Sequence, residues 1–327
     1  FAVGKSYNFN SDWKFSLQSD STCIVPQFDD SGWRSLTLPH DWSIEHPFDK
    51  NISSGNDGGY LPTGTGWYRK TFNLDNINPE NKYQLYIGGA YMDSDVYVNG
   101  KRAGGHPYGY SSYFVDITPY LKNGKNIVTI KVDNSAQKNC RWYSGSGLYR
   151  DVKLIETGPV HISNWGTYIT TPDLNTAEVE ISLDNETSTA KKVNVSIEIA
   201  GNKRNTEVEI PANTKGYKIK ETINVPDAKP WSPDSPDLYD ADIILSENGK
   251  EIDSHIQKVG FRTIEWDAEN GFKLNGKNLL LNGGCIHHDN GILGAAAYKD
   301  AERRRVRLMK EAGFNAVRTS HNIPSEA

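Results

Sequence analysis

The chain has 327 residues, of which 36% are hydrophobic and 11% aromatic, so it is long enough for two or three domains with packed cores. Its formal net charge is −5 and neither Lys nor Arg dominates a long segment, which argues against nucleic acid or an anionic membrane as a partner. The longest apolar runs fall far short of the ~20 residues that a membrane span needs. The three cysteines are too few for a disulfide framework and too scattered for a metal site.

Residues 13 to 155 predict a β-sandwich of the jelly-roll kind. Short strands of period two are broken by Gly, Asn and Pro, and no helix pattern intervenes. Asn99-Gly100 is typical of a tight hairpin turn between two such strands. We therefore assign residues 1–157 to a first all-β domain.

A second series of alternating strands begins near Gly158-Pro159. The stretches at 179–183, 193–199, 208–210 and 217–219 alternate cleanly within about a hundred residues, as in an immunoglobulin-like sandwich. We place this domain at residues 158–267 and expect no long helix in it or in the first domain. The dipeptide Asn185-Glu186 falls in one of its predicted turns.

The last part of the chain, residues 268–327, predicts a change of fold. Asn275-Gly276 is a second hairpin signal. The apolar run Leu279–Leu281 is too uniform for a half-exposed strand, so we expect a strand that is buried on both faces. Residues 314–318 resume an extended pattern after a helical segment, which together predict a βαβ unit with parallel strands.

The helix of this unit is predicted to span residues 301–312. Asp300 is a plausible N-cap, and Gly313 stands where a C′ glycine is expected. Its apolar sector includes Leu308 and Met309. Arg305 lies inside that sector and fits only by snorkelling or by pairing.

Polar residues follow both strands of the predicted βαβ unit. His287, His288 and Asp289 come after the first strand, and Thr319, Ser320 and His321 close the second. The carboxyl ends of parallel strands meet at one rim, which in an α/β barrel carries the chemistry.

Five segments carry a resemblance to a known family. NGKNLLLNGGCIHHD (275–289) and LMKEAGFNAVRTSHNIPSEA (308–327) resemble the opening of the catalytic TIM barrel of glycoside hydrolase family 2, which includes β-galactosidases, β-glucuronidases and β-mannosidases. Segments 28–48, 64–72 and 141–152 resemble the sugar-binding-like N-terminal domain of the same family, in the expected order. The resemblance implies a jelly roll, an immunoglobulin-like sandwich and the first part of a (β/α)8 barrel at 268–327.

The resemblance also implies a set of substrate-binding residues. His287 and His321 match positions that line the pocket of the terminal sugar, and Arg318 matches one at its rim. Isolated residues of these types at strand ends would more simply cap or pair locally, but their convergence at one rim favours a sugar site. Adjacent His288 and Asp289 complete the motif. They do not suggest a metal site, because neighbouring ligands project in different directions and no third partner is well spaced.

Two further substrate-binding candidates, Arg141 and Trp142, lie in a Gly/Ser-rich loop of the first domain. In the family this loop leans over the barrel mouth. Other members have an acidic residue near the position of Arg141, so the sugar preference stays open.

The family hydrolyses glycosides with two carboxyl groups about 5 to 5.5 Å apart, one a nucleophile and one an acid/base. The resemblance places both on glutamates of later barrel strands, so we expect no catalytic residue, no metal and no cofactor in this chain. Mg²⁺ or Na⁺ would be held by downstream residues of the complete enzyme. The 327-residue chain alone is expected to hydrolyse no glycoside.

The favoured hypothesis is the N-terminal part of a retaining exo-glycosidase acting on terminal β-D-galactosides, because HHDNG is nearest to β-galactosidase-like members. A β-glucuronidase, a β-mannosidase or a non-catalytic carbohydrate-binding scaffold are the alternatives. The expected partner is a carbohydrate, and a homo-oligomer is compatible with the resemblance. The chain begins with Phe, so we expect a processed or trimmed start, with a periplasmic or secreted location favoured and a cytoplasmic one left open.

Overall fold

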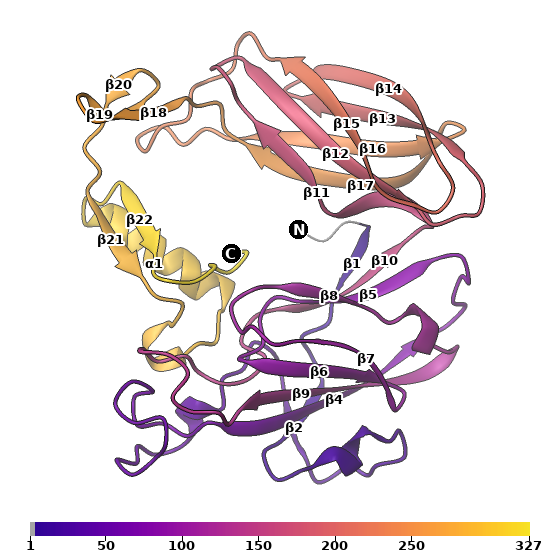
Figure 1. Ribbon diagram of the computed structural model, residues 1–327, viewed down its shortest axis with the longest axis vertical. Coiled ribbons are helices and arrows are strands. Elements are labelled where there is room, and N and C mark those ends of the chain that lie inside the picture. The colour runs from indigo at the N-terminus through magenta and orange to yellow at the C-terminus, as the bar shows by residue number, and fades with distance from the viewer. Residues whose placement is uncertain (1–3) are drawn as a thin grey trace. The chain divides into compact units, whose positions relative to one another are not determined.

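The computed structural model describes residues 4–327, and strands dominate it (Figure 1). The chain divides into two compact units. One contains residues 7–79, 83–155 and 283–327. The other is built mainly from residues 156–282.

The predicted jelly roll is a sandwich of two sheets. One sheet contains β2 (Trp13–Ser16), β3 (Arg34–Leu36), β4 (Gly64–Leu74), β6 (Asp93–Val98), β7 (Lys101–His106) and β9 (Gly124–Asn134) in the order β3-β2-β4-β9-β6-β7. The other contains β1 (Lys5–Asn8), β5 (Lys82–Ile87), β8 (Tyr113–Asp116) and β10 (Val152–Thr157) in the order β1-β10-β5-β8. Its helical elements are the short 3-10 turns η1 (Ser21–Ile24), η2 (Ser43–Glu45) and η3 (Thr118–Tyr120). Over residues 4–157, the described part of this domain, the expected sandwich without a long helix is confirmed.

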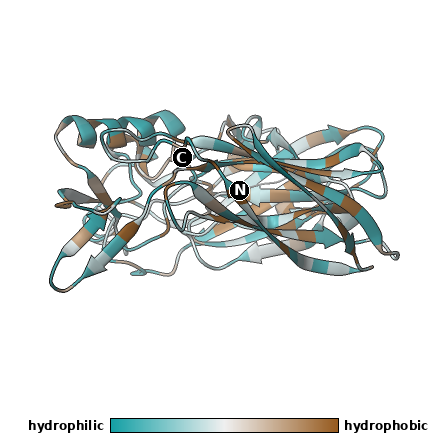
Figure 2. Cartoon of the chain, turned by 90° about the horizontal axis from the view of Figure 1, so that it is seen from above, coloured by the Kyte–Doolittle hydropathy of each residue, from teal (hydrophilic) through white to brown (hydrophobic). Residues whose placement is uncertain are grey.

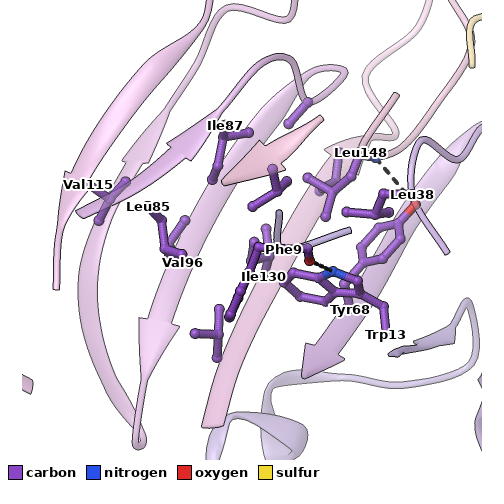
Figure 3. Packing of buried hydrophobic residues seen from close by; sticks show 14 of the residues in the cluster. Phe9, Trp13, Leu38, Tyr68, Leu85, Ile87, Val96, Val115, Ile130 and Leu148 are labelled. Carbon is purple, nitrogen blue, oxygen red and sulfur yellow. Dashed lines mark hydrogen bonds between the residues drawn. The ribbon is translucent and has the colours of Figure 1, made fainter. Parts of the chain in front are cut away.

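The core of this sandwich is aromatic as well as aliphatic (Figure 3). Trp13 and Tyr68 are fully buried, and their rings meet edge to face with centroids 6.4 Å apart. The indole Nε1 of Trp13 donates to the carbonyl oxygen of Phe9 at 2.8 Å, so the polar atom of a buried ring is satisfied. At the Asn99-Gly100 hairpin both residues have positive φ, as the predicted turn requires.

The second unit contains the predicted immunoglobulin-like sandwich. Strands β11 (Val160–Thr170), β12 (Thr176–Asn185) and β15 (Thr214–Asn224) form one sheet in the order β11-β12-β15. Strands β13 (Lys191–Ile199), β14 (Asn202–Ile210), β16 (Tyr239–Glu247) and β17 (Lys250–Val259) form the other in the order β14-β13-β16-β17. The alternation of apolar and polar residues along these strands, visible in Figure 2, places every second side chain in a shared aliphatic core.

A small meander follows in the same unit, with β18 (Ile264–Asp267), β19 (Gly271–Leu274) and β20 (Lys277–Asn278). Asn275 and Gly276 have φ of 51° and 73°, which confirms the predicted hairpin. The prediction for Leu279–Leu281 is wrong, because this run lies between β20 and the next strand, and Leu280 is 80% exposed. The strand that begins the barrel segment is instead the glycine-rich β21 (Gly283–Ile286).

The βαβ unit is present. Strand β21 pairs in parallel with β22 (Ala316–Thr319), and α1 (Lys299–Glu311) connects them after the 3-10 turn η4 (Gly291–Leu293). The N-cap of α1 is Tyr298 without a side-chain cap, so the prediction of Asp300 is wrong; Asp300 lies inside the first turn, where its charge favours the helix dipole. Gly313 has φ of 90° directly after the C-cap, as predicted.

The apolar sector of α1 is narrower than predicted. Met309 is half-buried whereas Leu308 is 40% exposed. Arg305 is accommodated by pairing, since its guanidinium meets the Glu302 carboxylate at 2.6 Å. No helix among residues 4–327 combines the length and the apolar character that crossing a bilayer requires.

Substitutions at a buried and an exposed leucine test which residues form the core of the second sandwich. Leu183→Ala removes a fully buried side chain from the second sandwich, and we expect it to lower the free energy of unfolding by about 2–5 kcal/mol. Leu280→Ala, at an exposed position of the same unit, should change it by less than about 0.5 kcal/mol. Urea unfolding of both variants measures this difference, and equal effects would contradict the assigned core.

Candidate functional site

The site begins at the carboxyl ends of β21 and β22. In the parallel register Ile286 lies opposite Thr319, and the Ser320 amide donates to the Ile286 carbonyl at 2.9 Å. The chain then leaves both strands at the same edge, so His287 and His321 emerge side by side. This is the arrangement that the sequence predicted from the strand ends.

Three predicted residues form one ring cluster, consisting of Trp142, His287 and His321. The two imidazole centroids are 5.5 Å apart, and the indole lies 5.6 Å from His287 and 5.1 Å from His321. Trp142 belongs to the loop between β9 and β10 of the sandwich, whereas the histidines belong to the barrel segment. The cluster is therefore assembled from residues more than a hundred positions apart.

A tyrosine that the sequence did not single out orients the indole of the ring cluster. Nε1 of Trp142 donates to the Tyr110 hydroxyl at 2.9 Å. Tyr110 is buried, and its ring packs edge to face on Tyr91 and on His288. With its N–H occupied, Trp142 can offer a partner only its ring surface.

A second missed residue, Asp41, fixes the loop that carries Trp142. Its buried carboxylate accepts backbone N–H groups of Ser43 (3.0 Å), Ser146 (2.9 Å) and Ala295 (2.8 Å) and the hydroxyl of Tyr143. Burial raises the pKa of Asp41, and these hydrogen bonds offset part of that rise. Its Pro-His-Asp-Trp context was part of the family resemblance, but nothing in the sequence indicated its partners.

Two glycines let this loop pack closely against Asp41 and the residues around it. Gly145 has φ of 70°, and a Cβ there would collide with the Asp41 carboxylate and with Ala295. Gly147 has φ of 122°, and a Cβ there would collide with the Tyr68 hydroxyl. The Ser-Gly-Ser-Gly sequence thus reflects close packing of the backbone rather than flexibility.

Helix α1 holds the loop that carries the histidines. One guanidinium nitrogen of Arg305 donates to the carbonyl oxygens of His287 and Asp289, each at 2.5 Å. A charged donor that spans residues 287 to 289 fixes the turn after β21. Arg305, which the sequence predicted to need a partner on the apolar face of the helix, therefore positions the loop that carries His287.

His288 has a different environment from its neighbour. It is 6% exposed, its Nε2 donates to the Ser144 carbonyl at 2.8 Å, and its ring packs between Tyr110 and Tyr149. Burial lowers the pKa of His288 to about 4. These contacts are those of a packing residue, and its predicted contact with substrate stays a prediction.

The other three candidates lie around the ring cluster. Asp289 is half-buried. The pKa of Tyr143 is raised mainly by burial and by the charge of Asp41, and the charge of Asp289 raises it further. Arg318 is exposed on β22, and its guanidinium lies 3.7 Å from the thiol of Cys285, the residue opposite it in register. Arg141 is exposed beside Trp142.

A cavity of about 250 Å³ borders the same strand ends. Val317 and Thr319 line it together with Arg305 and Val306 of α1, whereas Trp142 and His321 do not. Because side chains alternate along a strand, Val317 and Thr319 face away from Arg318. The cavity therefore lies mainly on the helix-facing side of the strand pair, and of the ring cluster His287 lines it.

The cluster is suited to binding a polyhydroxylated ring. Each neutral imidazole has one donor and one acceptor nitrogen for hydroxyl groups, and an indole face can pack on C–H groups. It contains no pair of carboxyl groups at the separation that glycoside hydrolysis requires. These residues can therefore recognise a sugar but cannot by themselves cleave one.

Comparison with known proteins identifies the origin of this arrangement. The family model for the sugar binding domain of glycosyl hydrolases family 2 matches residues 7–158, the general model of that family matches 160–262, and its TIM barrel domain matches 267–326. The chain belongs to glycosyl hydrolases family 2. All three successive parts of the chain therefore have counterparts in this family.

Similar proteins of this family carry different names. A β-galactosidase, BoGH2A of Bacteroides ovatus, is 40% identical over 97% of this chain, and a putative β-glucuronidase of Formosa agariphila is 39% identical over 96%. A crystal structure of a family 2 member from Bacteroides cellulosilyticus superposes with a TM-score of 0.94 at 38% identity over 98% of the chain. The chain spans 38%, 31% and 44% of the lengths of these three proteins, respectively.

The buried His288 gives the protein a defined pH dependence. Its pKa of about 4 in the folded state lies below the usual 6.5 of an unfolded chain, so between these values the unfolded state binds more protons. Stability from this group is complete above pH 6.5 and is lost as pH falls toward 4, by up to about 3 kcal/mol. Urea unfolding from pH 7 to 4 should show this slope, and His288→Gln should reduce it.

His46→Gln, a substitution at an exposed histidine, serves as the control for this measurement. An unchanged slope in His288→Gln would show that His288 is not the group responsible.

Proposed function

We propose that this chain is the N-terminal part of a retaining exo-glycosidase that hydrolyses terminal β-D-galactosides. The observation that carries the proposal is the ring cluster, in which Trp142 meets two histidines at the carboxyl ends of parallel barrel strands. That rim is where barrel enzymes bind substrate. Its donors, acceptors and flat apolar face match the terminal ring of a glycoside.

Catalysis in this proposal belongs to the whole protein. Retaining hydrolysis requires a nucleophile and an acid/base on two carboxyl groups about 5 to 5.5 Å apart. At the rim formed by the described residues Asp289 offers one carboxyl group, and it cannot serve both roles. The family resemblance assigns the two groups to glutamates on later strands, so this chain would contribute recognition and the remaining barrel the chemistry.

A galactoside is favoured over a glucuronide by the HHDNG motif and by the likeness to a protein named as a β-galactosidase. A β-glucuronidase is the second candidate, supported by relatives with that name and by two exposed guanidinium groups, Arg141 and Arg318, near the rim. A uronic acid carries a carboxylate, which an arginine binds strongly, whereas a galactoside has no carboxylate.

Kinetics of the whole protein on matched aryl galactoside, glucuronide and mannoside separate these candidates. A galactosidase should cleave the galactoside with the highest kcat/KM, and Arg141→Ala should leave the ratio among the three substrates nearly unchanged. Preference for the glucuronide, reduced in Arg141→Ala, would replace our proposal with the second candidate. No cleavage of any glycoside, with sugar binding retained, would indicate a non-catalytic carbohydrate-binding protein.

Substitutions in the ring cluster test the role of its imidazoles. If His287 and His321 bond to the sugar more strongly in the transition state, replacing either with Ala should lower kcat/KM by about 10²-fold or more, mostly through kcat. Steady-state kinetics and thermal melting of the whole protein should be measured together, with His46→Ala as a surface control. Near-normal kinetics with a lowered Tm would mean that the histidines only pack at the strand ends.

A further inference from the structure

A cluster of ionisable groups in the second sandwich has no part in the proposed function. His161 on β11 lies directly opposite Asp184 on β12, and Glu186 follows the end of β12. One ligand atom from each of the three residues lies within 4.8 Å of the others. His161 is 6% exposed, and the two carboxylate side chains are 14% and 18% exposed. One imidazole and two carboxylates form a ligand set that can bind a cation.

The imidazole of His161 is held in one tautomer. Its Nδ1 lies 3.0 Å from the carbonyl oxygen of Gly158, which can only accept, so Nδ1 carries a hydrogen. Nε2 then points toward Asp184, which is the usual arrangement of a metal-binding histidine whose other nitrogen is bonded to the backbone.

The distance between the His161 and Asp184 side chains bears on whether they share a proton or a metal ion. Nε2 of His161 and Oδ2 of Asp184 are 3.5 Å apart. A proton shared between such groups normally draws them to about 2.7–2.9 Å. Two ligands bound tetrahedrally to one zinc ion, at about 2.0–2.1 Å each, stand about 3.4 Å apart. The observed separation is close to that of two ligands of one zinc ion and longer than that of two groups sharing a proton.

The carboxylate of Asp184 is oriented for this role. Its other oxygen, Oδ1, accepts from the Ser163 hydroxyl at 2.5 Å and from the Gly216 amide at 2.8 Å. These bonds leave Oδ2 directed at the imidazole. Ligating carboxylates in metal sites are commonly held by such outer hydrogen bonds.

Glu186 has a cationic partner of its own. The ammonium group of Lys82 lies 2.5 Å from its Oε2. The nearby carboxyl of Asp253 is 6% exposed and accepts the amide of Ile162, the residue after His161, so it adds to the negative charge of the region. Lys82 balances one of these carboxylates, and a divalent ion would have to compete with it.

We propose that His161, Asp184 and Glu186 bind one divalent ion of the zinc type, with a fourth position for water. One nitrogen and two carboxylate oxygens suit Zn²⁺ better than Ca²⁺ or Mg²⁺, which prefer oxygen ligands alone. The ion would tie the start of β11 to the end of β12. We expected no metal in this chain, because the family resemblance places the metal ligands on downstream residues of the complete enzyme.

The first test uses the 327-residue chain, stripped of metal by EDTA and dialysed, in calorimetric titrations with zinc chloride. Wild type should bind Zn²⁺ at one ion per chain with a rise in Tm of a few degrees. His161→Ala and Asp184→Asn should each weaken binding by about 100-fold. Glu180→Gln, on the same strand but outside the cluster, should bind like wild type. Circular dichroism confirms that each variant is folded.

A gain-of-affinity variant and a spectroscopic probe complete the test. Lys82→Met removes the competing ammonium and should tighten Zn²⁺ binding by about tenfold or more. Co²⁺ should give the visible absorption of a tetrahedral site in wild type and not in His161→Ala. Absence of Zn²⁺ binding by wild type, binding unaffected by His161→Ala, no gain in Lys82→Met, or tighter binding of Ca²⁺ than of Zn²⁺ would each overturn the proposal.

Discussion

The buried carboxylate of Asp41 is the interaction on which the candidate site depends. It joins three segments that are far apart in the sequence, since it accepts amides from its own loop, from the Trp142 loop and from Ala295 of the barrel segment. A buried carboxylate is costly to desolvate, and it is tolerated here because several N–H donors and a hydroxyl converge on it. The same donors would be left unsatisfied without it. The rim and the sandwich loop are thus fixed together by one charge.

Two arginines extend this arrangement to the rest of the barrel segment. Arg305 holds the backbone after β21, and the buried Arg150 of the sandwich donates to the carbonyl of Ile323 after β22 at 2.9 Å. In both cases a guanidinium binds backbone oxygens, and that of Arg305 also pairs with the Glu302 carboxylate. Such contacts fix the course of the chain, so they leave the side chains of His287 and His321 directed toward Trp142.

Local signals in the sequence predicted local structure well. The Asn-Gly turns at 99 and 275 were right because the turn itself demands residues that accept positive φ. Leu279–Leu281 misled because apolar character alone does not distinguish a buried strand from an apolar connection, and the true strand β21 is rich in glycine. The N-cap predicted at Asp300 lies two residues after the observed one, Tyr298, because a helix can begin without a side-chain cap.

The site was predictable only in part. Strand ends and family motifs brought His287, His321 and Trp142 to attention, and the structure brings them together. Asp41 and Tyr110 were missed because their roles arise from partners distant in sequence, as with Asp41 and Ala295, which are 254 positions apart. No periodicity or spacing records such a contact. His288 was predicted as a site residue because it adjoins His287 in the motif, but the motif did not indicate that its side chain is buried.

The hydrogen bond between the Trp142 indole and Tyr110 limits what the site can distinguish. In the proposed sugar site, the indole, with its only donor already engaged, would meet a bound ring as a flat apolar surface, and such a surface responds to the shape of a C–H face more than to the position of any one hydroxyl. Sugars that differ in configuration at a single carbon would bind to this surface equally well unless the difference changes the C–H face that packs on the indole. In the proposed site, discrimination between epimers would then come from the two imidazoles of the ring cluster, which can hydrogen-bond to individual oxygens.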